Sequence, residues 1–223
     1  VDKVEVYSGI GDLTPIFSNE HILGNNINND SLGYIGEIDD FRIYNKGINQ
    51  TEINEVFVEG TSPFLISKNI TAANYTFDVS TISGNTINDL SGNSYNITAT
   101  GGSLISGQQG EAFDINLNEH LTLPTQVEGN SASLSISLWY YHEDDKALQQ
   151  VYSSYLTDIS NNIGSQIIIN NGYVNASHYN VGLINEVNSN VKLNKNSWNN
   201  IIVTMGENIS IYINIFIFCN NIK

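Results

Sequence analysis

Two carboxylates stand two positions apart in the run Gly33 to Asn45, which reads GYIGEIDDFRIYN. They are Glu37 and Asp39, and alternate residues of a β-strand point to the same face of a sheet. Retaining glycoside hydrolases need two carboxyl groups about 5 to 5.5 Å apart, one as nucleophile and one as acid/base. In the pattern of such a catalytic strand a further acid follows, but here Phe41 and Arg42 stand in its place. The sequence therefore begins this catalytic pattern and does not complete it.

A strip of aromatic and polar residues in Tyr173 to Asn180, YVNASHYN, is the best candidate for a sugar-binding site. Strand alternation places four side chains on one face, namely Tyr173, Asn175, Ser177 and Tyr179. Aromatic rings stack on the C–H groups of sugars, and neighbouring amides bind the hydroxyls. Tyr152 and Tyr155 are further members that the fold could bring to this strip. The alternative is an ordinary solvent-facing strand, which has the same alternation and no ligand.

Other catalytic signatures are missing from the sequence. It has no Gly-x-Ser-x-Gly elbow, no His-Glu-x-x-His, no cysteine pair and no glycine-rich phosphate loop before a helix. The four histidines are scattered along the chain, which favours ordinary polar positions over a set of ligands; they are His21, His120, His142 and His178.

The charge of the chain limits its partners. Its 223 residues carry a net charge of −15 with eight Lys and Arg residues. Nucleic acids and anionic membranes bind basic patches, so neither is expected as a partner. The longest apolar run, near Ile209 to Phe218, is half the roughly 20 residues that a membrane span needs, so we expect no membrane insertion. Neutral sugars and divalent cations fit this charge better.

The carboxylates of Gly33 to Asn45 must be positioned by a strand and a short helix. Apolar and β-branched residues throughout this run predict a strand covered on both faces. Directly behind it, Asn49 and Glu52 have the spacing of a capping box, which satisfies free backbone amides at a helix start. We predict one short helix near residues 49–57.

The rest of the chain reads as short strands separated by turns. The clearest is Ser133 to Tyr141, in which Leu134, Ile136 and Leu138 face one way. Repeated turn signals and the lack of helical periodicity predict an all-β fold, an antiparallel β-sandwich. The turn-rich segment Glu59 to Pro63 is the best internal boundary.

Both halves of the chain resemble parts of one known domain. Gly33 to Asn45 with the capped helix resembles the C-terminal signature of laminin G-like and pentraxin-like jelly rolls, members of the concanavalin A-like lectin and glucanase superfamily. The later stretch resembles the front of the same domain, through YTFD at 75–78, DLSGN at 89–93, the strand ending at Trp139, and SWNN at 197–200. The resemblance also implies that Trp139 and Trp198 are core residues.

The two parts stand in reversed order along the chain. Residues 1–58 resemble the C-terminal portion of the domain and residues 66–214 its N-terminal portion, joined by a linker at 59–65. Residues 215–223 depart from the family pattern. Two interpretations remain, a fragment of a tandem array and a circular permutant. Because a half-sandwich would leave apolar surface and sheet edges open, we predict that residues 1–58 complete residues 66–214 as one jelly roll.

The resemblance further implies a structural calcium ion near the junction of the first and last strands. The matching positions are Asp78 and Asp89 in the opening segment and Asp39 or Asp40 in the closing strand. The alternative is that these are turn and surface carboxylates, with Asp39 pairing with Arg42 or capping a backbone group. The acidic loop at 142–145, HEDD, is a second candidate for calcium and matches no specific family motif.

The function that the resemblance implies is a non-catalytic carbohydrate-binding or adhesion module of a larger extracellular or cell-surface protein. Its expected partners are a carbohydrate or glycoprotein and neighbouring domains of the same polypeptide. The competing hypothesis is a protein-interaction or spacer repeat. A glucanase-type hydrolase comes third, because its acid pattern is incomplete.

Overall fold

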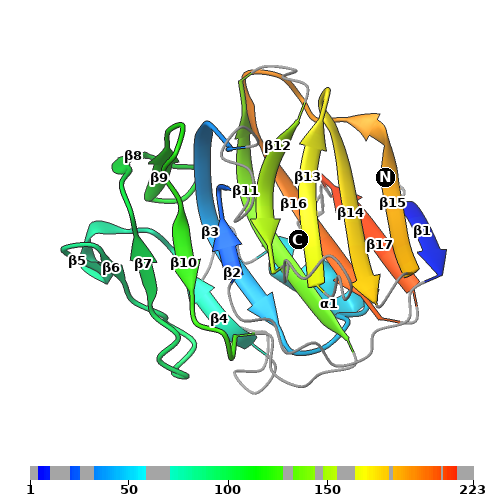
Figure 1. Cartoon of the computed structure of the whole chain (residues 1–223), viewed down its shortest axis with the longest axis horizontal. Helices are drawn as coiled ribbons and strands as arrows, with labels where there is room; N and C mark the ends of the chain where they lie inside the picture. The colour runs from blue at the N-terminus through cyan, green and yellow to red at the C-terminus, as the bar shows by residue number, and fades with distance from the viewer. Residues whose placement is uncertain are drawn as a thin grey trace, which may run out of the picture.

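A computed structural model describes most of the chain (Figure 1). The ranges described are 5–10, 21–25, 33–58, 71–127, 133–143, 148–154, 164–180, 183–206 and 208–214. They form two antiparallel sheets packed face to face, which confirms the predicted all-β sandwich. The predicted linker at 59–65 and the tail at 215–223 lie outside these ranges.

The first sheet, sheet A, carries the organising strand β3 in its interior. Its strands, in spatial order, are β1 (Glu5–Ile10), β17 (Asn208–Ile213), β16 (Ser197–Met205), β11 (Leu134–His142), β3 (Gly36–Tyr44), β9 (Glu111–Ile115) and β8 (Ser103–Ser106). An eighth strand, β4 (Thr71–Tyr75), pairs with the second half of β3 on the same side as β9.

The second sheet, sheet B, has nine strands. In spatial order they are β15 (Leu183–Lys192), β14 (Tyr173–Asn180), β13 (Gly164–Asn170), β12 (Gln149–Ser153), β2 (His21–Leu23), β10 (Leu121–Leu123), β7 (Ile97–Ala99), β6 (Thr86–Ile87) and β5 (Ile82–Ser83). A single 3₁₀ turn at Val79–Thr81 precedes β5.

The core lies between the sheets and follows strand alternation. On β11 the inward residues are all buried; they are Leu134, Ile136, Leu138 and Tyr140. This confirms the predicted facing of the first three. Phe41 of β3 adds an aromatic centre, with ring centroids 6.1 Å from Tyr75 and 6.0 Å from Tyr152.

Trp139 and Trp198 are not core residues, so that expectation is wrong. Because Leu138 and Tyr140 point inward, the pleat of β11 turns Trp139 to the outer face of sheet A. The same alternation on β16 buries Ile201 between the sheets and leaves Trp198 outside. Both indole rings are half-buried.

Strands β2 and β3 join two halves of the sandwich. In sheet A, β3 pairs with β11 on one side and with β9 and β4 on the other. In sheet B, β2 lies between β12 and β10. Within the described ranges, no strand ladder links residues 71–127 directly to residues 133–214. Figure 1 shows the two strands, in blue, at the middle of the molecule.

Helix α1 (Gln50–Val58) covers part of the outer face of sheet A. The Asn49 carboxamide oxygen accepts hydrogen bonds from the backbone amides of Thr51 (2.9 Å) and Glu52 (3.1 Å), and the Glu52 carboxylate accepts one from the Asn49 amide (2.8 Å). The capping box predicted from the sequence is therefore confirmed. Ile53 and Val56 then pack with residues that point outward from sheet A, such as Tyr44 and Ile202.

Candidate functional site

The predicted sugar-binding strip lies on the outer face of sheet B. On β14 the side chains of Val174, Ala176 and His178 are buried on the inner side. The residues that alternate with them form what we call the β14 strip, Tyr173, Asn175, Ser177 and Tyr179. Tyr173 is 37% exposed, Asn175 and Tyr179 are half-buried, and Ser177 is fully buried. The pleat thus brings all four to one face, although they differ in exposure.

Hydrogen bonds to neighbouring strands hold the amide end of the β14 strip. The Asn175 amide donates to the Glu186 carboxylate (2.6 Å) and to the Asn188 carboxamide (2.8 Å), both on β15. Asn188 in turn donates to Glu186 at 3.1 Å. The side chains of Glu186 and Asn188 are exposed, so this network presents oriented donors and acceptors to solvent.

The other members of the strip are also held by neighbours. Gln166 of β13 donates to the hydroxyls of Ser177 (2.8 Å) and Tyr179. The Lys192 ammonium lies 5.3 Å from the centre of the Tyr173 ring. Tyr152, a candidate further member of the strip, instead lies in the core, and Tyr155 falls outside the described residues.

Asp39 is a buried carboxylate with one free oxygen. Its side chain is fully buried; Oδ2 accepts a hydrogen bond from the Gln109 backbone amide at 2.8 Å, and Oδ1 has no hydrogen-bond partner. Burial raises the pKa of Asp39 to about 7, and the charges of Asp40 and Asp78 act in the same direction. The backbone amides of Gln109 and Asp40 oppose the shift only in part.

Asp78 faces the same loop as Asp39. Its Oδ1 accepts a hydrogen bond from the Glu111 amide at 3.2 Å. The loop at 107–111 passes so closely that a Cβ on Gly107 would lie 2.7 Å from Asp39 Oδ2, and one on Gly110 would lie 2.3 Å from Asp78 Oδ1. Two of the four predicted calcium ligands therefore meet at one loop.

The other two predicted ligands have different partners. Asp40 forms an ion pair with Arg42 (2.9 Å), which is the pairing that the sequence analysis considered for Asp39. The Asp89 carboxylate accepts hydrogen bonds from the amides of Asn74 (2.9 Å), Ser91 (2.8 Å) and Tyr95 (3.1 Å), and from the Ser91 hydroxyl (2.7 Å). Asp89 thus organises the turn at 89–95 through its oxygens.

The surroundings of Asp39 and Asp78 suit a hard cation better than a soft one. Calcium takes six to eight oxygen ligands from carboxylates, backbone carbonyls and water. Among the residues that the structure describes, no group of three or more His, Cys, Asp or Glu side chains could hold a metal ion. A cation at this loop would therefore use the two carboxylates together with backbone oxygens. The free Oδ1 of buried Asp39 is the observation that fits such a ligand set. In the acidic loop at 142–145, Asp144 and Asp145 lie outside the described residues.

Glu37 and Asp39 do not share one electrostatic environment. The charges near Glu37 are those of Asp114 and Glu143, whereas those near Asp39 are Asp40 and Asp78. Glu37 of β3 stands directly opposite Asp114 of β9. Burial raises the pKa of Glu37, and the Asp114 charge raises it further. Sequence reasoning missed this pair because nothing local to either residue shows which strands become neighbours.

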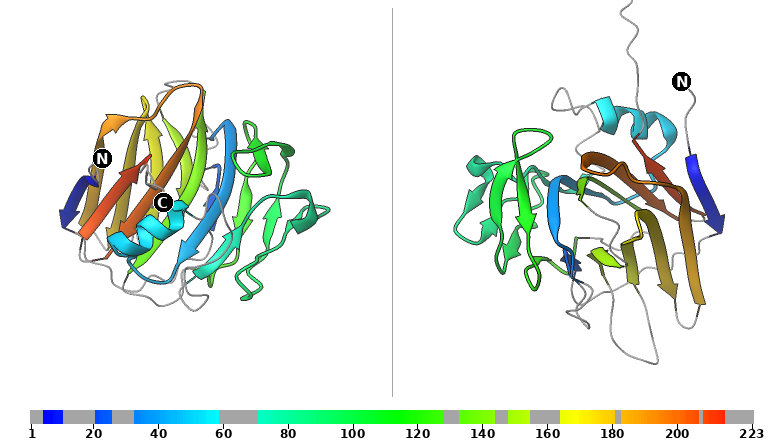
Figure 2. Two further views of the ribbon diagram at one scale, coloured as in Figure 1. Left: turned by 180° about the vertical axis from the view of Figure 1, so that it is seen from behind. Right: turned by 90° about the horizontal axis from the view of Figure 1, so that it is seen from above.

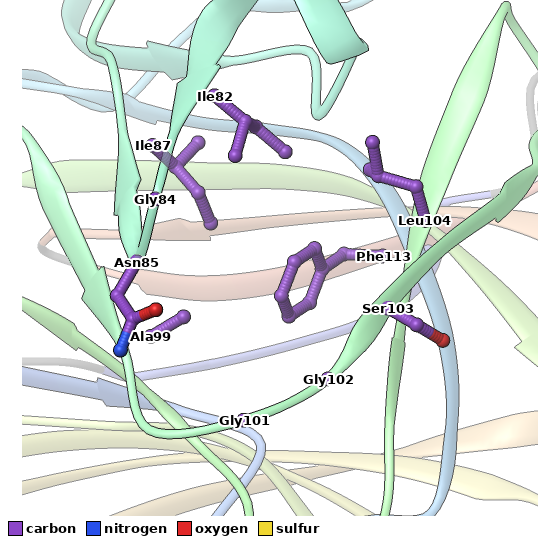
Figure 3. Close-up of a pocket in the computed structure, with 10 residues that line it drawn as sticks. All are labelled: Ile82, Gly84, Asn85, Ile87, Ala99, Gly101, Gly102, Ser103, Leu104 and Phe113. Carbon is purple, nitrogen blue, oxygen red and sulfur yellow. The ribbon is translucent and has the colours of Figure 1, made fainter.

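A small pocket lies at the opposite end of the sandwich from the β14 strip (Figures 1 and 3). Its volume is about 180 Å³, and apolar side chains of Ile82, Ile87, Leu104 and Phe113 form its walls. Gly102 belongs to its lining and has a φ of +100°; a Cβ there would come within 2.3 Å of the Phe113 ring. This pocket is large enough for one small ring and smaller than the sites of drug-sized ligands.

Comparisons with protein-family models, with curated proteins and with solved structures find no match to this chain. In the described part of the chain, no helix has both the length and the apolar character that a membrane span requires.

Proposed function

We propose that the chain is a non-catalytic carbohydrate-binding or adhesion module that works outside the cell or at its surface, within a larger protein. The proposal follows the laminin G-like resemblance of the sequence. Its ligand would be a neutral saccharide, bound across β13, β14 and β15 on the outer face of sheet B. The observation that carries this assignment is the exposed Tyr173 ring beside the network of Asn175, Glu186 and Asn188.

The chemistry of this network suits sugar hydroxyls. Each hydroxyl is both a donor and an acceptor, and Glu186 offers carboxylate oxygens while the two amides offer both functions. Because these groups already hold one another, little side-chain entropy remains to be lost when a ligand binds. The Tyr173 ring adds an apolar surface for the C–H face of a pyranose.

Binding to a panel of immobilised glycans tests this proposal. We expect Asn175→Ala and Tyr173→Ala each to weaken the bound glycan by about 1 kcal/mol, roughly fivefold. Tyr141→Ala removes a half-buried tyrosine from the other sheet and serves as the matched control, with affinity unchanged. Equal losses in all three variants, or no glycan bound by the wild-type protein, would contradict the assignment and favour the protein-interaction or spacer function.

A second candidate function is calcium binding by Asp39 and Asp78 as a structural staple. The unpartnered, fully buried Oδ1 of Asp39 favours it, since a buried carboxylate is stable when a cation compensates its charge. Calcium that binds only the folded state should raise the melting temperature in a concentration-dependent way, and chelator should reverse the effect. Asp78→Asn should remove the calcium-dependent rise, whereas Asp89→Asn should lower the baseline stability and keep the rise. A wild-type melt that is insensitive to calcium would rule the site out.

A further inference from the structure

The outer face of sheet A beyond helix α1 carries a group of aromatic, acidic and amide side chains. We call it the aromatic face, and its residues are Glu37, Asp114, Trp139, Tyr141, Trp198 and Asn200. Strand alternation turns all six away from the core, because their neighbours Ile38, Phe113, Leu138, Tyr140 and Ile201 are buried between the sheets. They come from four adjoining strands, β9, β3, β11 and β16. Figure 2 shows that α1 lies across only part of this side of the sheet.

Three aromatic rings form the centre of this face. Tyr141 is paired with Trp198 across β11 and β16, and their rings meet edge to face, with centroids 5.5 Å apart and an angle of 68°. Trp139 lies two residues before Tyr141 on the same side of β11. All three side chains are half-buried, so each keeps ring surface accessible to a ligand.

Two carboxylates lie on the strands beside the rings, Glu37 on β3 next to β11 and Asp114 on β9 beyond it. Glu37 is directly opposite Asp114 of β9. On the other side of β3, Ile38 pairs with Tyr140 of β11, so the next position of this antiparallel ladder places Glu37 beside Tyr141. Like charges directly opposite each other on adjacent strands destabilise a sheet. Within the described ranges no ion pair involves either carboxylate, and Arg42, the cation on β3, is paired with Asp40. A bound positive charge would relieve this repulsion.

Asn200 adds an independent observation. It is paired with Trp139 across β11 and β16, it is 3% exposed, and its side-chain oxygen has no hydrogen-bond partner. A buried carbonyl oxygen without a donor costs about 1 to 3 kcal/mol, so such atoms usually mark a missing partner. The carboxylates of Glu37 and Asp114 and the free oxygen of Asn200 are all hydrogen-bond acceptors.

We propose that the aromatic face binds an organic cation, an ammonium or guanidinium group carried by a lysine or arginine side chain of a basic polypeptide. Ring faces attract such cations, carboxylates compensate their charge, and an amide oxygen accepts their N–H groups. The surface lies on one sheet face and crosses four adjoining strands, which suits an extended segment. The net charge of −15 draws a basic partner toward it at low ionic strength.

Tryptophan fluorescence tests the proposal directly, because both tryptophans of the chain, Trp139 and Trp198, lie on this face. The full chain is titrated with a lysine-rich peptide, with the same peptide acetylated at every lysine, and with n-butylamine. We expect saturable quenching by the lysine peptide, weaker binding at higher salt, and at least about tenfold weaker binding of the acetylated peptide. Equal binding of both peptides overturns the proposal. Butylamine binding as tight as that of the lysine peptide overturns the polypeptide source.

Isosteric variants identify the residues responsible. Glu37→Gln and Asp114→Asn preserve shape and should each weaken the lysine peptide severalfold, and the double variant should weaken it further. Glu186→Gln removes a carboxylate of β15, on the other sheet, and is the matched control, expected to leave the affinity of the lysine peptide unchanged. Melts of each variant verify that it is folded. Unchanged affinity in the folded double variant overturns the proposal, and this result is independent of whether the β14 strip binds glycans.

Discussion

At the scale of single residues, the position of a carboxylate determines what it can do. Asp39, Asp40, Asp78 and Asp89 share one chemistry, and the sequence offered all four as calcium ligands. In the structure Asp40 forms an ion pair with Arg42, and the Asp89 carboxylate accepts hydrogen bonds from backbone amides. Asp39 is left buried with a free oxygen beside Asp78. The local sequence does not distinguish these four carboxylates, because the loop at 107–111, which contacts Asp39 and Asp78, lies far away in the sequence.

Asp39 should make stability depend on pH when calcium is removed. The pKa of Asp39 is about 7 in the folded state, above its value of about 4 in the unfolded chain. At pH values between these two, the folded state holds a proton on Asp39 that the unfolded chain has lost. The free energy of unfolding should therefore fall as pH rises from about 4 to about 7, and this component should level off above that range. Urea titrations in chelator at several pH values measure it.

Asp39→Asn is the variant that isolates this effect. An asparagine cannot ionise, so we expect the variant to be more stable than the wild-type protein at pH 8 in chelator and to lose the slope between about pH 4 and 7. Glu52→Gln, which changes the half-buried carboxylate of the helix cap, should retain the slope. An identical slope in Asp39→Asn and wild type would mean that another group is responsible.

At the scale of elements, local signals were sufficient for α1 and for the facing of β11 and β14. The hydrogen bonds of a capping box join residues within four positions of each other, so the local sequence is enough to predict it. Alternation similarly placed Leu134, Ile136 and Leu138 inside. The same alternation turns Trp139 and Trp198 outward, against the core positions that the family resemblance implies.

The cap of α1 gives a prediction at this scale. Asn49→Ala removes the acceptor for two backbone amides and should lower the free energy of unfolding by about 1 kcal/mol. Asn49→Ser retains a capping oxygen and should recover most of that loss. Urea denaturation monitored by circular dichroism compares the three proteins. A cost in the serine variant as large as that in the alanine variant would contradict the capping explanation.

At the scale of the whole molecule, β2 and β3 hold together strands from both sides of the sandwich. Ile38 is a fully buried residue of β3, placed opposite Phe113 on one side and Tyr140 on the other. Ile38→Ala should cost about 2 to 5 kcal/mol, the range for emptying a buried aliphatic site. Because strands of both halves pair with β3, the loss of packing at Ile38 should destabilise both halves, and they should unfold together.

Hydrogen exchange distinguishes this behaviour from local damage. In Ile38→Ala the amides of β9 and of β16 should lose protection by the same factor, although they lie on opposite sides of β3. As a control, Ile53→Ala empties a site in the cluster beneath α1. Retained protection in β13 to β15 with loss in β8 and β9 would show that the halves fold independently of β3.

The sequence by itself determined the all-β class, the one helix and the faces of the clearest strands, because these follow from alternation, turns and caps within a few residues. It also placed the four residues of the β14 strip on one face. Tertiary structure alone decided which carboxylates meet, that Glu37 stands opposite Asp114, and that Tyr152 is buried. The physical reason is that sheet neighbours here can be more than a hundred residues apart, as for Tyr140 and Ile38, and the sequence of one strand does not specify which strand pairs with it.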